Sequence, residues 1–174
     1  MREAEAIASA RTLPLVHVPD DPVSRSMGVN DWDVVNQSAG GIKVKRAGTT
    51  TQAVSVGEVV GVKYLGRDRW TIGVVRWLTQ LDDGGMEFGI QFLAPAARAV
   101  AVQPMATAGG AARQGLMLME SEAATDPDSL LTPPSTYSDL REFEIEEDGE
   151  IVTVRAQGLI EKTGRFELFQ ISPS

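Results

Sequence analysis

The feature that most constrains the fold of this chain is a set of short segments in which apolar and polar residues alternate. Across residues 42–46, Ile42 and Val44 are separated by lysine, and across residues 142–146 two apolar residues are separated by glutamates. A period of two residues is typical of a β-strand with one buried face. No long stretch has the 3.6-residue period of an amphipathic helix. The sequence therefore predicts an all-β chain.

Turn sequences divide the chain into hairpins of expected strands. Asp82-Asp83-Gly84-Gly85 precedes an alternating segment at residues 86–92, and Asp148-Gly149 is a two-residue hairpin signal. Residues 70–77 are apolar on both faces, as expected in the wall of a closed barrel. The other expected strands are residues 13–18, 31–35, 58–64, 115–119, 151–154 and 166–171. We expect an antiparallel β-barrel followed by a smaller C-terminal β-rich unit.

Composition suggests four segments along the chain. Residues 105–113 are rich in alanine and glycine without periodicity, which is typical of a linker. We therefore expect a flexible N-terminal arm at residues 1–10, the barrel at residues 11–104, the linker at residues 105–113 and an acidic β-rich unit at residues 114–174.

Charge is distributed unevenly between these segments. The net charge of −8 lies entirely in residues 113–174, which hold five Lys/Arg against thirteen Asp/Glu, whereas residues 1–112 hold eleven of each. Residues 41–76 are instead locally basic, with seven cations against two acids; the cations are Lys43, Lys45, Arg46, Lys63, Arg67, Arg69 and Arg76. A local positive field suits a small anionic ligand. The acidic C-terminal part disfavours DNA as a partner.

Few residues are available for catalysis. The chain has no cysteine, and His17 is its single histidine, so it cannot build a thiolate or multi-histidine metal site alone. There is no Gly-x-Ser-x-Gly turn. No apolar run is long enough to cross a bilayer, and the N-terminus lacks the apolar stretch of a secretory signal. We expect a cytoplasmic, non-enzymatic protein without catalytic residues, metal or membrane insertion.

The segment Asn36-Gln37-Ser38-Ala39-Gly40-Gly41 lies between two expected strands and has two readings. Asn and Ser bond their own backbone in turns, and Gly supplies positive φ, so a plain turn explains it. Alternatively, the Ser38 hydroxyl and the N–H groups of Gly40 and Gly41 could bind phosphate oxygens. The Asn36 side chain could then accept hydrogen bonds from the Watson–Crick edge of a guanine.

The pattern Asn36-x-Ser38-x-x-Gly41 resembles the [Asp/Asn]-x-Ser-x-x-Gly signature of PilZ domains, which are bacterial receptors for cyclic di-GMP. Residues 73–77 and 88–92 are similar to the paired strands that close the PilZ barrel. The resemblance covers residues 11–104, and residues 113–174 are similar to a β-rich extension of larger PilZ proteins. It implies cyclic di-GMP as ligand and no other cofactor.

The chain departs from the second PilZ element, an Arg-x-x-x-Arg motif on an arm upstream. Arg11 stands at the expected place of the second arginine, but Ile7 stands four residues before it, and no Arg-x-x-x-Arg occurs in the sequence. One bidentate arginine contact to a base is worth about 1–3 kcal/mol, roughly a tenfold to hundredfold change in affinity. Arg25, Lys43 and Lys45 are the candidates to supplement the lost arginine.

Two functions follow from these residues. The first is a signalling module that binds cyclic di-GMP through Arg11, Asn36, Ser38, Gly40 and Gly41, helped by Arg25 and Lys43, and relays the signal to an unknown partner protein. The alternative is a degenerate module that binds no nucleotide and acts as a protein-interaction scaffold, because its first arginine is missing.

The tryptophans and the acidic run also have two readings each. Trp32, Trp70 and Trp77 suit either a stacking platform for bases or core packing within strands, and core packing is the favoured interpretation. The run at residues 142–150 lacks the ligand spacing of a calcium loop. It is instead typical of a solvated edge strand protected by charge.

Overall fold

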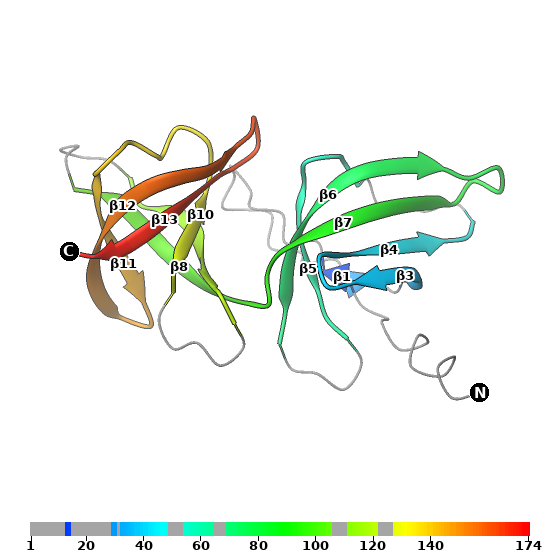
Figure 1. Cartoon of the computed structure of the whole chain (residues 1–174), viewed down its shortest axis with the longest axis horizontal. Helices are drawn as coiled ribbons and strands as arrows, with labels where there is room; N and C mark the ends of the chain where they lie inside the picture. The colour runs from blue at the N-terminus through cyan, green and yellow to red at the C-terminus, as the bar shows by residue number, and fades with distance from the viewer. Residues whose placement is uncertain are drawn as a thin grey trace. The chain divides into compact units, whose positions relative to one another are not determined.

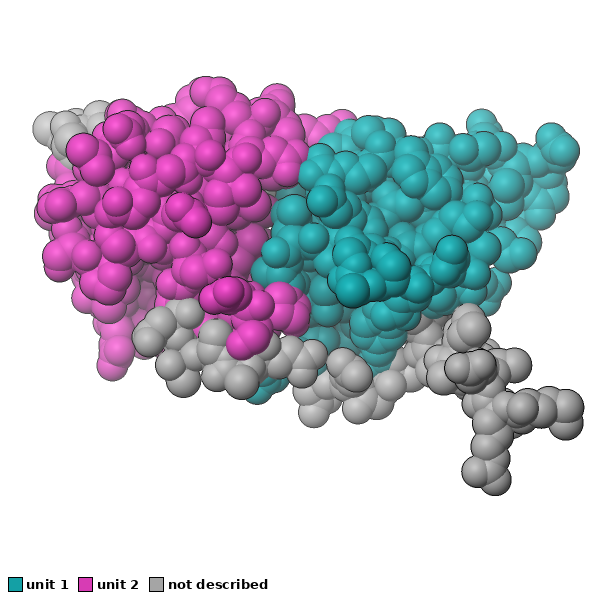
Figure 2. Space-filling model, viewed as in Figure 1, with its two compact units in different colours: residues 1–94 teal, residues 95–174 magenta. Residues whose placement is uncertain are grey.

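The computed structural model describes residues 13–14, 29–30, 32–48, 54–64, 69–105, 111–121 and 127–174. The described residues form thirteen β-strands and no helix, which confirms the all-β prediction (Figure 1). The chain divides into two compact units, Met1–Ala94 and Pro95–Ser174 (Figure 2).

Unit 1 is built on a five-stranded antiparallel sheet. Figure 1 shows its strands in the order β3-β4-β7-β6-β5, with β6 and β7 as its longest members. Their bounds are Asp33–Ser38 for β3, Gly41–Arg46 for β4, Met86–Ala94 for β7, Thr71–Gln80 for β6 and Val59–Val62 for β5. A short pair, β1 (Leu13–Pro14) and β2 (Val29–Asn30), forms a separate two-stranded sheet.

One face of the five-stranded sheet carries the core of unit 1. Alternation places Ile42 and Val44 of β4 on this face, opposite Ile90 and Phe88 of β7. Trp32 packs edge-on against Phe88, with ring centroids 4.7 Å apart. The core cluster consists of Trp32, Ile42, Val44, Val54, Val60, Val62, Val75, Phe88 and Ile90. On the other face, Lys43 and Lys45 of β4 are at least partly exposed, whereas Val59 of β5 and Val74 of β6 are buried.

Unit 2 is a closed six-stranded barrel with its own core. The strand order is β10-β13-β12-β11-β8-β9. The bounds are Ala96–Pro104 for β8, Arg113–Met119 for β9, Ser129–Thr132 for β10, Glu142–Glu147 for β11, Glu150–Lys162 for β12 and Glu167–Pro173 for β13. Phe143 and Phe169 stack in its centre, with ring centroids 5.7 Å apart. Closure pairs each of these six strands on both sides, so none of the described strands of this unit is an edge strand.

The two units divide ten residues earlier than the sequence suggested. We expected the boundary between residues 104 and 105, but β8 pairs with β9 and β11 of the second barrel. Arg113, placed at the end of the expected linker, is the first residue of β9. The alanines of β8 hide its strand character, because alanine has low β-propensity and gives no apolar alternation.

Candidate ligand-binding site

The hairpin between β3 and β4 turns through only two residues, Ala39 and Gly40. Ser38 and Gly41 are paired directly across it, and Asn36 and Ser38 belong to β3. The expected six-residue turn is therefore too wide. The polar residues that suggested a turn are accommodated because β3 is an edge of the described sheet, where exposed polar side chains are common.

The two glycines of this hairpin differ in what the fold demands of them. Neither has a positive φ, so the left-handed conformation is not the reason for glycine at either position. A Cβ on Gly41 would lie 2.4 Å from the carbonyl oxygen of Ile90, so the close approach of β4 to β7 requires glycine there. A Cβ on Gly40 would meet no atom within 4 Å. The fold alone thus explains Gly41 but not Gly40.

Strand pairing brings the predicted residues of β3 and β4 onto the face of the sheet opposite the core. Directly paired residues in an antiparallel sheet share a face. The pairs are Asn36–Lys43 and Ser38–Gly41 between β3 and β4, Lys43–Gly89 and Gly41–Gln91 between β4 and β7, and Gly89–Trp77 between β7 and β6. A continuous surface across four strands results, with glycines at its centre.

The indole of Trp77 packs directly over Gly89. A Cβ on Gly89 would lie 2.2 Å from Nε1 of Trp77 and 2.5 Å from its Cε2, so the indole occupies the space of the missing side chain. An aromatic residue covering a cross-strand glycine is a recurrent device in sheets. Trp77 is nevertheless 40% exposed, so part of its ring remains accessible.

These residues line a shallow cavity of about 340 Å³ on the outer face of the sheet. This volume lies at the lower end of the range of small-molecule pockets, roughly 300–1,000 Å³. The cavity is lined by Asn36, Gln37, Ser38, Gly40, Gly41, Ile42, Lys43, Arg76, Trp77, Gly89, Ile90 and Gln91. Polar groups of β3 stand at one side, and a guanidinium and an indole of β6 stand at the other.

Two cations of the cavity have defined polar partners. The Nε of Arg76 donates a hydrogen bond of 2.7 Å to Oε1 of Gln91. The Nζ of Lys43 lies 3.3 Å from Oε1 of Glu87 in an ion pair. Among the described residues, the Ser38 hydroxyl makes one long contact, of 3.5 Å, to the Gly41 carbonyl oxygen. A hydrogen bond of this length is weak, so exchanging it for one to a ligand would cost little.

The structure brings together five of the seven predicted ligand-binding residues. Asn36, Ser38, Gly40, Gly41 and Lys43 all line the cavity. Arg11 and Arg25 lie outside the described residues, as does His17.

Sequence reasoning did not place Arg76, Gly89 and Gln91 of β6 and β7 in the site, and it offered Trp77 only through the less favoured stacking interpretation. The favoured core position holds for Trp32 but is wrong for Trp77, which is exposed beside the cavity. The pairing of Trp77 with Gly89 indicates that the indole lies on the outer face, but this pairing is known only once the strand register is known.

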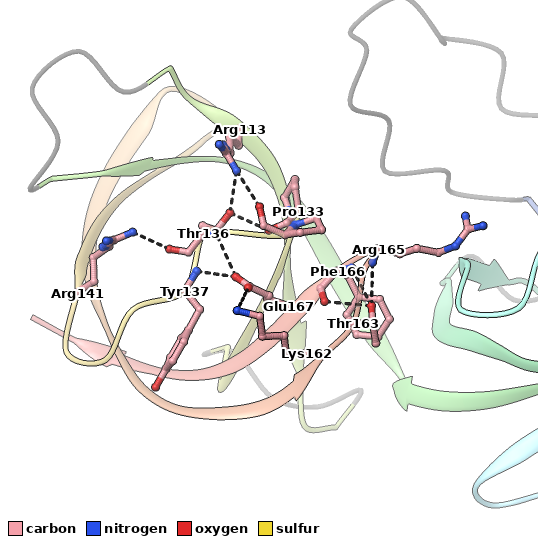
Figure 3. A network of polar contacts seen from close by, with 11 residues as sticks. Arg113, Pro133, Thr136, Tyr137, Arg141, Lys162, Thr163, Arg165, Phe166 and Glu167 are labelled. Carbon is pink, nitrogen blue, oxygen red and sulfur yellow. Dashed lines mark hydrogen bonds and ion pairs between the residues drawn. The ribbon is translucent and has the colours of Figure 1, made fainter.

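A second polar network lies in unit 2 and surrounds the buried carboxylate of Glu167 (Figure 3). Oε2 of Glu167 accepts hydrogen bonds of 2.9 Å and 2.7 Å from the backbone N–H groups of Thr136 and Tyr137. Nζ of Lys162 lies 3.1 Å from Oε1. Arg113 and Arg141 donate to carbonyl oxygens of the same loop, those of Pro134 and Thr136. The network holds residues 133–137 against β13.

The environment of Glu167 sets its protonation. Burial alone would raise the pKa of this carboxyl, but hydrogen bonds from Tyr137, Lys162 and Thr136 outweigh it, and the net pKa is lowered. The folded barrel therefore favours the ionised form of the Glu167 carboxyl. We assign this group a structural role, because its hydrogen bonds and its ion pair with Lys162 join residues 136–137 and β12 to β13.

Within the described ranges, no group of three or more His, Asp or Glu side chains is arranged to hold a metal ion. The same residues contain no helix that is long and apolar enough to span a membrane.

A β-hairpin with Asn-x-Ser-x-x-Gly, the motif that resembles the PilZ signature, is thus set beside a hollow on the outer face of a sheet. Residues 20–99 match the family described as the middle PilZ domain of the cyclic-di-GMP receptor FimW, and residues 100–174 match the FimW C-terminal β-barrel domain. The PilZ match thus lies mainly in unit 1, and the β-barrel match lies in unit 2. The matched family is described as that of a receptor, in line with the expectation of a non-enzymatic chain.

A curated relative supports this assignment. The cyclic-di-GMP receptor FimW of Pseudomonas aeruginosa is 30% identical over 142 residues, which cover 79% of this chain and 23% of the relative. The chain therefore spans less than a quarter of the length of that protein. No solved structure matches the chain significantly.

Proposed function

We propose that the outer face of β3, β4, β7 and β6 binds cyclic di-GMP. The observation that carries this proposal is the cavity itself, which joins Asn36 and Ser38 of the signature motif to Arg76 and Trp77 across a glycine floor. The family match and the relative named as a cyclic-di-GMP receptor support it independently.

Each side of the cavity has chemistry suited to one part of a guanine dinucleotide. The Ser38 hydroxyl and the backbone near Gly40 suit phosphate oxygens, and the Asn36 carbonyl oxygen suits the N–H donors of a guanine. The exposed part of the Trp77 indole offers a stacking surface, and base–aromatic stacking is worth about 1–3 kcal/mol per base. A Cβ on Gly40 would meet no atom within 4 Å, so a ligand has room to approach the backbone closely there.

We further propose that binding is relayed to a partner protein through unit 2, in the bacterial cytoplasm. β7 carries Gly89 and Gln91 of the cavity and ends at Ala94, and β8 of the second barrel begins at Ala96. Only Pro95 separates the two strands, so a ligand that stiffens β7 acts on a segment continuous with unit 2.

Isothermal titration with cyclic di-GMP tests the proposal. We expect saturable binding by the native chain and a loss of roughly tenfold or more in Ser38→Ala, because a hydrogen bond to a charged group is worth about 1.5–3 kcal/mol. Thr79→Ala is the matched control, since Thr79 is exposed on β6 but does not line the cavity.

Absence of heat and of any spectral change with the native chain would refute the nucleotide proposal. That result would favour the alternative, a module that works as a protein-interaction scaffold without nucleotide. Equal affinity of the native chain and Ser38→Ala would place the ligand elsewhere.

A further inference from the structure

The register of β6 and β7 contains an irregularity beside the cavity. Val75 pairs with Ile90 and Trp77 pairs with Gly89, so Arg76 is an extra residue on β6. Such a β-bulge shifts the alternation of the strand that contains it. The side chain of Val75 is fully buried in the core, whereas Arg76 and Trp77 are both exposed and line the cavity. The bulge thus places two consecutive side chains on the ligand face.

Both side chains are held in place by β7. Trp77 lies on Gly89, and Nε of Arg76 donates to Oε1 of Gln91 over 2.7 Å. Gln91 is paired with Gly41 on its other side, so its amide stands next to the signature hairpin. A hydrogen bond at Nε fixes the orientation of the guanidinium plane. A guanidinium can donate two parallel hydrogen bonds to a phosphate group.

We propose that Arg76 is the phosphate-binding arginine of this site and that Gln91 is its positioning residue. The inference rests on the proposed function and adds a ligand contact that the signature motif does not include. The chain has no Arg-x-x-x-Arg, so an arginine anchored within the sheet replaces one expected on an arm. An arginine that is already oriented loses less conformational entropy on binding than one on a flexible segment.

A double-mutant cycle with cyclic di-GMP tests the inference by titration. Arg76→Ala is expected to weaken binding roughly tenfold to hundredfold. Arg76→Lys, which keeps the charge but loses the fork, is expected to bind nearly as weakly. Gln91→Ala is expected to weaken binding about threefold to tenfold in the native background and to have no further effect in Arg76→Ala, because it acts through the guanidinium.

Lys63→Ala is the electrostatic control. Lys63 contacts Trp70 and does not line the cavity, so its loss removes one positive charge of the same unit and is expected to change affinity less than twofold. Circular dichroism and thermal unfolding verify that each variant keeps the native fold.

The outcomes separate this inference from the proposed function. If Ser38→Ala loses binding while Arg76→Ala binds like the native chain, the inference is wrong and the proposed function stands. If Arg76→Lys binds like the native chain, the positioning role of Gln91 is wrong.

If the native chain does not bind cyclic di-GMP, the proposed function fails, and inorganic pyrophosphate becomes the probe for Arg76. A shift of the Arg76 Nε–Hε NMR signal that is lost in Gln91→Ala would support the anion site. Absence of that shift would overturn it.

Discussion

At the scale of single residues, the glycines of the cavity differ in whether the fold tolerates a side chain, and the sequence alone does not reveal this difference. Gly41→Ala would bring a Cβ to 2.4 Å from a backbone oxygen, so the sheet must shift. We expect it to lower the free energy of unfolding by about 1–3 kcal/mol. Gly40→Ala meets open space without positive φ, and we expect a change within about 1 kcal/mol. Urea unfolding of the two variants measures the contrast; equal losses would contradict it.

Trp77 gives the site its own optical signal. Because its indole is partly exposed beside the cavity, we expect cyclic di-GMP to quench tryptophan fluorescence, and Trp77→Phe to abolish most of that quenching. Trp70→Phe is the control, since Trp70 does not line the cavity and contacts Lys63, whose Nζ lies 5.3 Å from the ring centroid. Quenching that survives in Trp77→Phe would contradict the proposed stacking of a base on Trp77.

At the scale of elements, the clamp around Glu167 predicts how the second barrel responds to pH. The folded-state pKa of Glu167 is lowered, so the unfolded chain binds its proton more readily than the folded chain does. Its contribution to stability is fully present above the unfolded pKa, about 4.3, and is lost as pH falls through the lower folded pKa. Glu167→Gln should therefore be less stable than the native chain at pH 7 and lose less stability on acidification.

Urea unfolding of unit 2 between pH 7 and pH 3 measures this effect. We expect a loss of about 2 kcal/mol or more at pH 7, because the carboxylate accepts two buried backbone hydrogen bonds. Glu146→Gln is the control, as Glu146 is exposed on β11 and should change stability by less than about 0.5 kcal/mol. Identical pH profiles for the native chain and Glu167→Gln would contradict the assignment.

The sequence predicted strands well where one face is buried and the neighbours are regular. The alternation of Ile42 and Val44 and the Asp148-Gly149 turn identified β4 and the β11–β12 hairpin. The bulge at Arg76 could not be predicted, because it is defined by the pairing of β6 with β7 and not by β6 alone. Uninterrupted alternation from Val75 would turn Trp77 inward, whereas the bulge places it on the outer face.

At the scale of the whole molecule, the position of β8 decides where the chain can be divided. A chain of residues 95–174 contains all six barrel strands, and we expect it to unfold cooperatively on its own. A chain of residues 105–174, cut at the boundary that composition suggested, lacks β8 and leaves β9 and β11 unpaired on that side. We expect it to lack a cooperative thermal transition by circular dichroism. Cooperative unfolding of the shorter chain would contradict the assignment of β8 to unit 2.

The proposed relay also belongs to this scale. Unit 2 carries most of the excess acid, with six Lys/Arg against thirteen Asp/Glu from residue 95 onward, so its charge alone makes it a poor nucleotide site. We expect cyclic di-GMP to slow hydrogen exchange in β7 and in the adjoining residues of β8, while β12 is unchanged. Protection confined to unit 1 would agree with the proposed nucleotide site but would contradict the proposed relay through unit 2.

The central claim is that one face of the first sheet is the cyclic di-GMP site. Amide and side-chain NMR spectra recorded during a cyclic di-GMP titration test it most directly. The account predicts shifts at Ser38, Gly40, Gly89 and Gln91 and at the indole Nε1–H of Trp77, with the Glu167 network of unit 2 unchanged. Shifts confined to unit 2, or none at saturating ligand, would contradict it.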